Sequence, residues 1–323
     1  MPNIVPPPEW APHKAVWIGF PSHPELWEDD LEPAREEVAA FARAVHAEGE
    51  GEQVILVAAD DEAARAAVRV AGDVAEVVVQ PFGDIWLRDT GPILTGDGAA
   101  RAFRFNGWGG KYDLPGDDDI GLRLADMIGV AVERCDWVLE GGAIDGDGTG
   151  RVVTTRQCLL NHNRNPDLSQ DEIAARLKAD LGFGEIVWLG DGLLNDHTDG
   201  HVDNLARFVA PGVVAIPQAT ENDPNWLVYA QAADAADAAG LDVTRIPSPG
   251  RVLRDDEVIP ASYMNFYIGN AAVVVPLYGA PNDDAAVAAI QALFPTRAVT
   301  GLRADAILTG GGSFHCISQQ IPA

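Results

Sequence analysis

The stretch Gly310-Gly311-Gly312-Ser313-Phe314-His315-Cys316-Ile317-Ser318-Gln319-Gln320 places a glycine run shortly before a cysteine that follows a histidine. Consecutive glycines let the backbone adopt φ > 0 and approach a ligand closely, and they leave amide N–H groups free to face a developing charge. Cys316 is therefore a candidate nucleophile, provided that a neighbouring group favours its thiolate, because an ordinary thiol has a pKa of about 8.5. The alternative is a glycine loop before a half-buried strand at 316–319, in which the cysteine only fills the core.

Outward from this stretch, short apolar runs alternate with segments of helical periodicity. We expect strands at 15–20, 53–58, 74–79, 102–105, 151–155, 185–189, 202–210, 213–217, 241–246, 263–268 and 271–276. We expect helices at 30–46, 61–71, 120–127, 169–181, 225–239 and 284–294. Because strands and helices interleave without an obvious linker, the sequence predicts a repeated α/β unit rather than two unrelated domains.

The polar stretches that could carry chemistry recur at similar intervals. Asp89, Glu140, His201, Asn265 and Cys316 are separated, by subtraction of their numbers, by 51, 61, 64 and 51 positions. Five units of comparable length therefore fit the chain. This repeat is predicted from spacing and element order alone, because no sequence identity between the units is visible.

The composition indicates a globular protein. Of its 323 residues, 47% are hydrophobic and 22% are charged, and no apolar run approaches the roughly 18 residues that a membrane span needs. The N-terminal residues MPNIVPPPEW lack the basic region and apolar core of a signal peptide. Cys135, Cys158 and Cys316 show no paired spacing, which favours reduced thiols. We therefore expect a cytoplasmic protein.

The formal net charge of −27 arises from 49 acidic and 22 basic residues. Nucleic acid and anionic membrane surfaces are therefore unfavourable partners, because a phosphate-binding patch would be opposed by the surrounding acids. A small cation is favoured over an anion. The alternative is that the acidic surface only maintains solubility.

Two aromatic segments could form the walls of a binding site. In Trp86-Leu87-Arg88-Asp89-Thr90-Gly91-Pro92, Asp89 could bind a cationic ligand beside Trp86, or an Arg88–Asp89 pair could pin the turn. The segment Asn106-Gly107-Trp108-Gly109-Gly110-Lys111-Tyr112 is glycine-rich with aromatics that we expect to be exposed, which is typical of a loop that covers a site. Trp108 could equally pack the loop onto its own domain. No phosphate-binding glycine motif is present, so the sequence gives no support for a nucleotide cofactor.

In the segment Leu139-Glu140-Gly141-Gly142-Ala143-Ile144-Asp145, Glu140 and two glycines follow directly on the apolar run 137–139. A glutamate at the end of a buried strand is costly unless it is paired, so Glu140 is expected to orient or charge a histidine. The alternative is a surface turn.

The densest polar stretch is His197-Thr198-Asp199-Gly200-His201-Val202-Asp203-Asn204. In one extended strand His197, Asp199, His201 and Asp203 would share a face and could hold a divalent ion that activates water. A metallohydrolase is therefore a competing interpretation. Against it, Gly200 interrupts the strand, and the apolar run suggests that regular structure begins only near His201.

These segments together identify a family resemblance. WLRDTGP, FNGWGGKY, EGGAIDGDGTG, TDGHVDN, ASYMNFYIGN and GGGSFHCISQQ occur in the order seen in the agmatine deiminases, which lie with bacterial peptidyl-arginine deiminases in the guanidino-group-modifying, or pentein, superfamily. The resemblance covers nearly the whole chain. It implies one pentein catalytic domain over 1–323, folded as a five-bladed α/β propeller of ββαβ-like units around a central active site.

The resemblance also implies roles for individual residues. Asp89 and Asp203 would bind the guanidinium, Glu140 would support the histidine, His201 would be the general acid and base, and Cys316 the nucleophile. Trp86, Trp108, Gly311 and Gly312 are the further candidates for substrate binding. The chain departs from the family at His197, where an acidic residue is usual.

The expected activity is hydrolysis of agmatine to N-carbamoylputrescine and ammonia through a covalent thiouronium intermediate, with no metal or organic cofactor. Two carboxylates that accept guanidinium N–H groups would fix the carbon over a thiolate. Deimination of arginine, peptidyl-arginine or another guanidine, and amidinotransfer on the same fold, are the nearest alternatives. A metal-dependent hydrolase and a non-catalytic ribosome-binding pentein are further ones, and the latter is opposed by the charge. A homo-oligomer is compatible with the sequence.

Overall fold

The strands form five sheets and a small hairpin in the computed structural model, which describes residues 3–323. In four sheets the first two strands are antiparallel and the third is parallel to the second. These sheets comprise β4 (Ile93–Leu94), β5 (Ala100–Arg104) and β6 (Val132–Val138); β7 (Ile144–Gly146), β8 (Arg151–Thr154) and β9 (Glu185–Trp188); β10 (Arg207–Ala210), β11 (Val213–Gln218) and β12 (Asp242–Pro247); and β15 (Tyr267–Ile268), β16 (Ala272–Leu277) and β17 (Ala298–Arg303). The hairpin is β13 (Leu253–Arg254) with β14 (Glu257–Val258).

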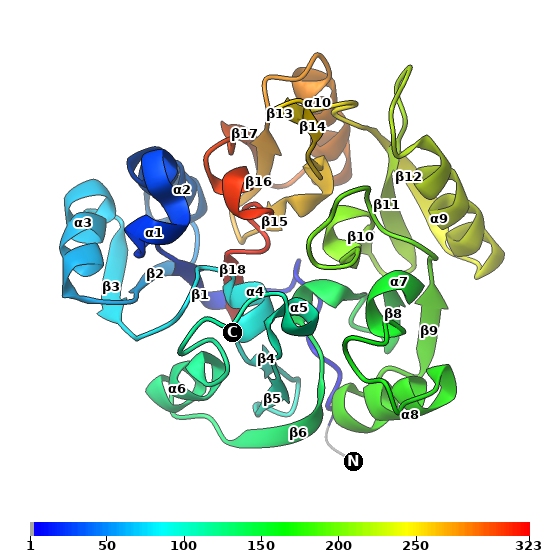
Figure 1. The fold of residues 1–323 in the computed structure, drawn as a ribbon, viewed down its shortest axis with the longest axis horizontal. Coiled ribbons are helices and arrows are strands. Elements are labelled where there is room, and N and C mark those ends of the chain that lie inside the picture. Colours follow the sequence, from blue (N-terminus) through cyan, green and yellow to red (C-terminus); the bar gives the residue numbers. More distant parts are fainter. Residues whose placement is uncertain (1–2) are drawn as a thin grey trace.

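The remaining sheet joins strands from the two ends of the chain. Its order is β18 (Ser318–Pro322), β1 (His13–Gly19), β2 (Gln53–Ala58) and β3 (Ala75–Val79). The β18–β1 pair is antiparallel, whereas β1–β2 and β2–β3 are parallel. This sheet therefore repeats the design of the other four, with its first strand supplied from the far end of the sequence. Figure 1 shows the five sheets arranged around a common centre, near which β18 lies beside β1.

Helices connect the parallel strands of each sheet. These connecting helices are α2 (Leu31–His46), α3 (Asp61–Ala71), α6 (Ile120–Met127), α8 (Gln170–Leu181), α9 (Trp226–Ala238) and α10 (Asp283–Leu293). Four single-turn helices accompany them: α1 (Pro24–Trp27), α4 (Leu87–Thr90), α5 (Gly107–Gly110) and α7 (Arg156–Leu159). No helix within residues 3–323 combines the length and the apolar character needed to cross a membrane.

Local sequence signals explain where the helices begin. Asp60 caps α3 by accepting hydrogen bonds from the backbone N–H groups of Glu62 and Ala63, and Ser169 forms a capping box with Glu172 at the start of α8. Such caps satisfy backbone donors that the first helical turn leaves free. The helices predicted at 61–71 and 120–127 have these bounds in the structure, and the other four predicted helices differ by one residue at one or both ends.

Three strand predictions are wrong in part. The predicted strand 202–210 begins as a 3-10 turn, Val202–Asn204, and only β10 (Arg207–Ala210) is extended. The N–H groups of Leu205 and Ala206 both donate to the carbonyl of Val202, which turns the chain. The predicted strand 263–268 likewise begins as the 3-10 turn Tyr263–Asn265, where Ser262 accepts from the N–H of Met264. At 316–319, the strand begins only at Ser318, so Cys316 precedes it.

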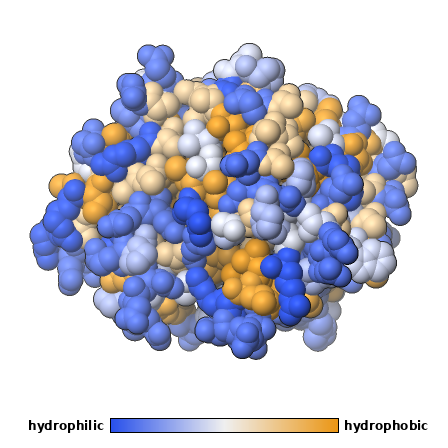
Figure 2. Space-filling model, turned by 90° about the horizontal axis from the view of Figure 1, so that it is seen from above, coloured by the Kyte–Doolittle hydropathy of each residue, from blue (hydrophilic) through white to orange (hydrophobic). Residues whose placement is uncertain are grey.

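Aromatic packing fixes the loop that leads to the candidate nucleophile. Phe314 is fully buried and stacks on Phe41 of α2 with ring centroids 4.8 Å apart. Phe41 also packs edge-on against Tyr267 of β15. The segment before Cys316 is therefore anchored to two different sheets, and burying each such aromatic side chain contributes roughly 1.5–3 kcal/mol. Figure 2 shows a largely hydrophilic face with scattered hydrophobic patches, in line with the acidic composition.

Candidate active site

The candidate site residues lie in turns that precede the first strand of each sheet. Asp89 is in α4 before β4, Glu140 precedes β7, and His201 and Asp203 precede β10. Asn265 precedes β15, and Cys316 precedes β18. Because each sheet begins near the common centre, the regular spacing of these residues in the sequence has a structural basis. The six side chains come together there, although they are far apart along the chain.

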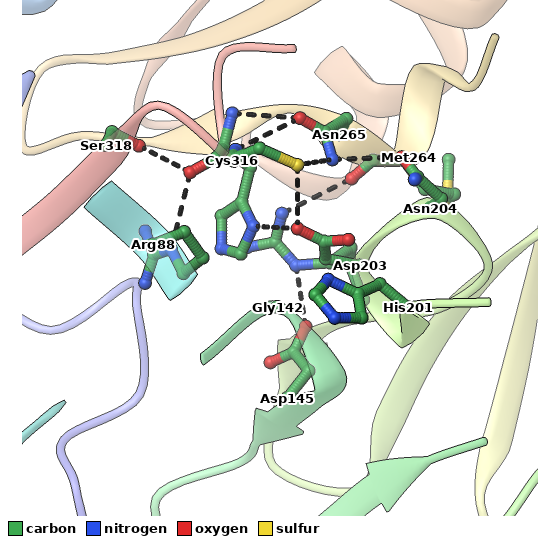
Figure 3. A network of polar contacts seen from close by, with 12 residues as sticks. Arg88, Gly142, Asp145, His201, Asp203, Asn204, Met264, Asn265, Cys316 and Ser318 are labelled. Atoms are coloured by element: carbon green, nitrogen blue, oxygen red, sulfur yellow. Dashed lines mark hydrogen bonds and ion pairs between the residues drawn. The ribbon is translucent and has the colours of Figure 1, made fainter. Parts of the chain in front are cut away.

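Cys316 is held by one amide and one carboxylate. Its Sγ lies 3.3 Å from Asp203 Oδ2 and accepts a hydrogen bond from Asn265 Nδ2 at 3.1 Å (Figure 3). The Asn265 side chain is itself fixed because its Oδ1 accepts from the N–H groups of His315 and Cys316. Burial, together with the charges of Asp203 and Asp89, raises the pKa of the Cys316 thiol well above its ordinary value. Cys316 therefore rests as a thiol.

Two buried carboxylates face this thiol in different electrostatic states. Asp89 Oδ1 accepts from the N–H of Gly142 at 2.9 Å and Oδ2 accepts from Trp108 Nε1 at 3.0 Å, while burial raises the pKa of its carboxyl. Burial acts in the same direction on Asp203, but His315, whose Nδ1 lies 2.8 Å from Oδ2, holds the pKa of Asp203 below its usual range. Asp203 Oδ1 is buried and has no hydrogen-bond partner among the described residues.

Gly142 allows three functional groups to converge. A Cβ added to Gly142 would lie 2.6 Å from His201 Nδ1, 2.8 Å from Asp89 Oδ1 and 3.2 Å from Asp203 Oδ2. Contacts below 3 Å with such atoms are not tolerated without displacement, so only glycine fits here. Figure 3 shows Gly142, His201 and Asp203 close to Cys316.

His201 is fully buried and carries positive charge. Its Nδ1 lies 3.6 Å from Asp89 Oδ1, and neither ring nitrogen has a hydrogen-bond partner within residues 3–323. Burial alone would lower the pKa of His201, but the Asp89 carboxylate, with Cys158 and Glu140, raises it well above its ordinary value. Two unsatisfied ring nitrogens in a buried site are available to a substrate and a water molecule.

Glu140 is paired with a buried arginine. It is fully buried, its Oε1 accepts from Arg164 Nε at 2.6 Å, and its Oε2 has no partner among the described residues. Glu140 is thus not a surface turn acid. Arg164 also donates to Asp199 Oδ2, which holds the 197–201 turn beside Glu140.

The histidine-rich segment does not form the extended metal site considered from the sequence. Asp199 has a positive φ of 63°, and the N–H of His201 donates to Thr198 Oγ1, so residues 197–201 form a turn. A different group, Glu140, Cys158 and His201, has ligand atoms within 4.8 Å of one another. The Arg164 guanidinium on Glu140 opposes a cation at that place.

A cavity of about 180 Å³ leads to Cys316. Its walls include Trp86, Trp108, Gly311 and Gly312, all of which were singled out in the sequence, together with Leu26, Asp84, Asp89, Tyr112, Leu114, His197, Thr198, Thr309 and Gly310. Burial raises the pKa of Asp84 to about 6, and its Oδ2 accepts from Trp86 Nε1 at 2.8 Å. The cavity is therefore an aromatic pocket with acids along its wall.

The glycine run packs directly on the tryptophan wall. A Cβ at Gly310 would lie 2.4 Å from the Trp86 ring, and one at Gly312 would lie 2.6 Å from that ring and 3.1 Å from Cys316 Sγ. Gly311 adopts a φ of 98°, which favours glycine. The close approach inferred from the sequence is thus made first of all to protein atoms.

Two local interpretations from the sequence are corrected. Arg88 does not pair with Asp89, because its guanidinium donates to Gln320 Oε1 at 2.8 Å and lies 3.5 Å from Glu9 Oε2. Trp108 is buried rather than exposed, since its indole donates to Asp89, whereas Tyr112 is exposed.

Several contributing residues were missed in the sequence. Asp84 lines the pocket, Cys158 lies beside His201, and Arg164 and His315 contact Glu140 and Asp203, while Glu9 reaches the site only through His315. Only His315, the neighbour of Cys316, carried a local signal for its place in the site. Glu9 and Arg164 act through contacts that the sequence does not show.

Known proteins resemble this chain over nearly its whole length. The model of the Porphyromonas-type peptidyl-arginine deiminase family matches residues 5–322. The chain belongs to this family. Agmatine deiminase of Ectopseudomonas mendocina is 38% identical over 98% of this chain and 95% of its own length. The structure of agmatine deiminase from Enterococcus faecalis, 31% identical, superposes with a TM-score of 0.91 over 99% of this chain and 96% of that one. The resemblance identified from the sequence is therefore confirmed.

The fold is shared more widely than the family. DDAH from Pseudomonas aeruginosa, 15% identical, has a TM-score of 0.58 over 96% of this chain and 100% of its own. An amidinotransferase from Microseira wollei, 11% identical, has a TM-score of 0.56 over 99% of this chain and 97% of that one. This chain thus shares its α/β fold with these two proteins.

Proposed function

We propose that this chain is an agmatine deiminase, which hydrolyses the guanidinium of agmatine to N-carbamoylputrescine and ammonia. The observation that carries the proposal is the arrangement at Cys316, whose sulfur lies 3.3 Å from Asp203 Oδ2 while Asp89 and His201 flank Gly142 beside it. The near full-length likeness to agmatine deiminases supports the same reaction.

The two carboxylates bind the guanidinium. Asp203 Oδ1, which lacks a protein partner, and the Asp89 carboxylate accept its N–H groups as charge-assisted hydrogen bonds. Trp86 and Trp108 enclose the planar cation in the pocket. Its positive charge offsets the two acids that disfavour the Cys316 thiolate, so substrate binding itself promotes loss of the thiol proton.

The first half of the reaction forms a carbon–sulfur bond. The thiolate of Cys316 attacks the guanidinium carbon, and the tetrahedral adduct collapses as the bond to one terminal nitrogen breaks. His201, which is protonated in the resting site, gives its proton to that nitrogen, so that ammonia leaves. A thiouronium remains on Cys316, and His201 is left neutral.

The second half uses His201 in the opposite sense. Neutral His201 takes a proton from water, whose oxygen attacks the thiouronium carbon. The carbon–sulfur bond then breaks, and the hydroxyl proton of the departing ureido product passes to sulfur, which restores the Cys316 thiol. Glu140, beside His201 and paired with Arg164, stabilises the imidazolium that forms. His201 thus acts as the general acid in the first half of the reaction and as the general base in the second.

The pocket favours agmatine over arginine. Its described lining residues include the acids Asp84 and Asp89 but neither lysine nor arginine. An α-carboxylate would meet like charge there, whereas the terminal ammonium of agmatine finds the Asp84 carboxylate above about pH 6, the value to which burial raises its pKa. His197, at the usually acidic position, accepts or donates a hydrogen bond with Tyr112 Oη at 3.0 Å.

Arginine, peptidyl-arginine and other guanidines remain the nearest alternatives. Amidinotransfer would use the same thiouronium with an amine in place of water. A metal-dependent hydrolase would need a cation beside Glu140, where Arg164 already lies. A ribosome-binding role without catalysis is opposed by the net charge of −27.

The finer description of the fold is also a proposal. We infer that residues 1–323 form one pentein catalytic domain and that the five sheets are blades of an α/β propeller, a description supported by their shared strand order. A cytoplasmic location is supported by the three free cysteines. Assembly into a homo-oligomer stays a prediction.

The test is conversion of agmatine, arginine and a peptidyl-arginine by purified protein, with detection of the ureido product. We expect agmatine to be preferred, a thiol alkylator to abolish turnover, and a strong metal chelator to leave it intact. Full activity after alkylation, or loss of activity on chelation, would favour the metal-dependent alternative. Asp84→Asn should raise the KM for agmatine and leave the slow conversion of arginine nearly unchanged.

A further inference from the structure

His315 lies between two buried carboxylates. Its Nδ1 is 2.8 Å from Asp203 Oδ2, and its Nε2 is 2.8 Å from Glu9 Oε2. The His315 residue is 3% exposed, so water does not replace either contact. Glu9 comes from the N-terminal segment, and Asp203 from the turn before β10. One imidazole thus connects the substrate-binding acid to the opposite side of the centre.

Both carboxylates that face the ring are ionised. Burial raises the pKa of Glu9, but Arg207, His315 and Arg88 together hold it well below its usual range, and the pKa of Asp203 is also lowered. An ionised carboxylate can only accept a hydrogen bond. Each ring nitrogen of His315 must therefore donate, which requires a proton on both.

We propose that His315 is a positioning residue that donates from both ring nitrogens, so that it holds Asp203 as a carboxylate through Oδ2 and leaves Oδ1 for the guanidinium. This role rests on the proposed function. It also explains why Asp203 and Asp89 differ although both are buried beside Cys316: only Asp203 is in contact with His315.

The surrounding charges keep the imidazolium in place. Arg207 pairs with Glu9 at 2.9 Å and with Asp145 at 2.6 Å, so the Glu9 carboxylate is held in place by Arg207 as well as by His315. Arg88 Nε donates to the carbonyl of His315 at 3.3 Å. No other titratable side chain within residues 3–323 is hydrogen-bonded or ion-paired to the His315 ring. The positive charge adjacent to Cys316 in sequence then also favours the thiolate once substrate is bound.

Two neutral variants separate charge from hydrogen bonding. His315→Asn keeps a donor near the place of Nδ1, toward Asp203, and His315→Gln keeps one near Nε2, toward Glu9. If the charge of His315 is what matters, both variants lower kcat/KM for agmatine by about ten- to a hundredfold, as loss of a charged hydrogen-bond partner does. Both also move the acid limb of the kcat/KM profile to higher pH, because Asp203 then protonates more readily.

Ser318→Ala is the matched control. Ser318 Oγ donates to the carbonyl of His315 at 3.0 Å, so the variant loses a buried contact to the same residue without touching the charge. Its acid limb should not move. If His315→Asn kept near wild-type activity and an unchanged acid limb of the kcat/KM profile, His315 would serve only as a hydrogen-bond donor to Asp203. The same result for His315→Gln would mean that His315 serves only as a donor to Glu9. Either outcome overturns the proposal.

A second measurement does not depend on turnover. Nitrogen-15 NMR of histidine-labelled wild-type protein at neutral pH, without ligand, should show protons on both ring nitrogens of His315, with the signals assigned by their loss in His315→Asn. A single protonated nitrogen would overturn the proposal. If the wild-type protein did not convert agmatine, the proposed function would fail, while this spectrum would still decide the charge of His315.

Discussion

At the scale of single residues, the site disfavours the thiolate form of Cys316 in the absence of substrate. Cys316 lies beside Asp203 and is close to Asp89, and both acids raise the pKa of its thiol after burial has done so. Such a nucleophile is protected until a cation arrives. In the proposed mechanism, selectivity for cationic substrates and control of reactivity would therefore come from the same two carboxylates.

Asp89→Asn should separate these two effects. Loss of the charge-assisted contact to the guanidinium should cost about 2–5 kcal/mol in kcat/KM, but removal of the negative charge should lower the pKa of Cys316 and speed its alkylation in the absence of substrate. Iodoacetamide inactivation rates at several pH values, beside agmatine kinetics, measure both. Slower alkylation in a folded variant would mean that Asp89 does not restrain the thiol.

Much of the candidate site could be predicted from local sequence, because the glycines and acids that matter stand next to one another. Glu140 followed by Gly141 and Gly142 is such a case, since Gly142 is required by the approach of His201. Glu9 could not be predicted, since its partner His315 is 306 residues away. Its burial is decided by the fold rather than by its neighbours in sequence.

At the scale of elements, hydrophobic periodicity predicted strands and helices well but not the turns that carry chemistry. Val202 and Leu205 look like strand residues, yet the 3-10 turn between them aims Asp203 at the centre. The strands β6 and β17 were missed because neither is a continuous apolar run: Glu133, Arg134 and Asp136 interrupt β6, and Thr300 and Gly301 interrupt β17, which is only partly buried. The strand and helix propensities of neighbouring residues do not indicate which turns bring side chains to a central site.

The loop before α6 gives an element-scale prediction about stability. Asp117 Oδ1 accepts from the N–H groups of Gly83 and Asp84, which fixes the segment leading to Trp86, and burial raises the pKa of its carboxyl to about 7. The folded protein therefore holds a proton that the unfolded chain releases near pH 4. This contribution to stability is complete below about pH 4 and is lost as pH rises through about 7.

Asp117→Asn keeps the accepting oxygen and removes the titration. The variant should be more stable than wild type at pH 8, by up to about 4 kcal/mol, with a smaller gain at pH 5. Urea unfolding at both pH values measures this, and Asp118→Asn, at an exposed neighbour, serves as control. An equal effect of Asp117→Asn at the two pH values would show that the carboxyl does not titrate in this range.

At the scale of the whole molecule, the regular spacing of polar stretches predicted five units, and the structure has five sheets of shared strand order. The spacing could not show that the first of these sheets takes its edge strand β18, which lies near the centre, from the far end of the sequence. In β18, Gln319 pairs with Trp17 and Ile321 with Ala15 of β1. Such a pairing joins segments about 300 residues apart in the sequence, which no local pattern encodes.

Ile321→Ala tests how much the pairing of β18 with β1 contributes to stability. Ile321 is 7% exposed, and truncation of a buried isoleucine costs about 2–5 kcal/mol. We expect a loss of that size in the free energy of unfolding, with kcat/KM of the folded fraction unchanged. Val79→Ala, at the exposed edge strand β3, should change the stability little. A loss of no more than a few tenths of a kcal/mol for Ile321→Ala would mean that β18 adds little to the stability of the protein.

The late position of β18 also matters while the protein is being made. A nascent chain that has been translated as far as Leu308 contains Asp89, Glu140, His201 and Asp203, but neither the nucleophile nor the strand that completes the first sheet. Its acids would face one another without Cys316 or the His315 cation. Premature termination anywhere before Cys316 therefore yields a chain that lacks the proposed nucleophile together with the strand that follows it.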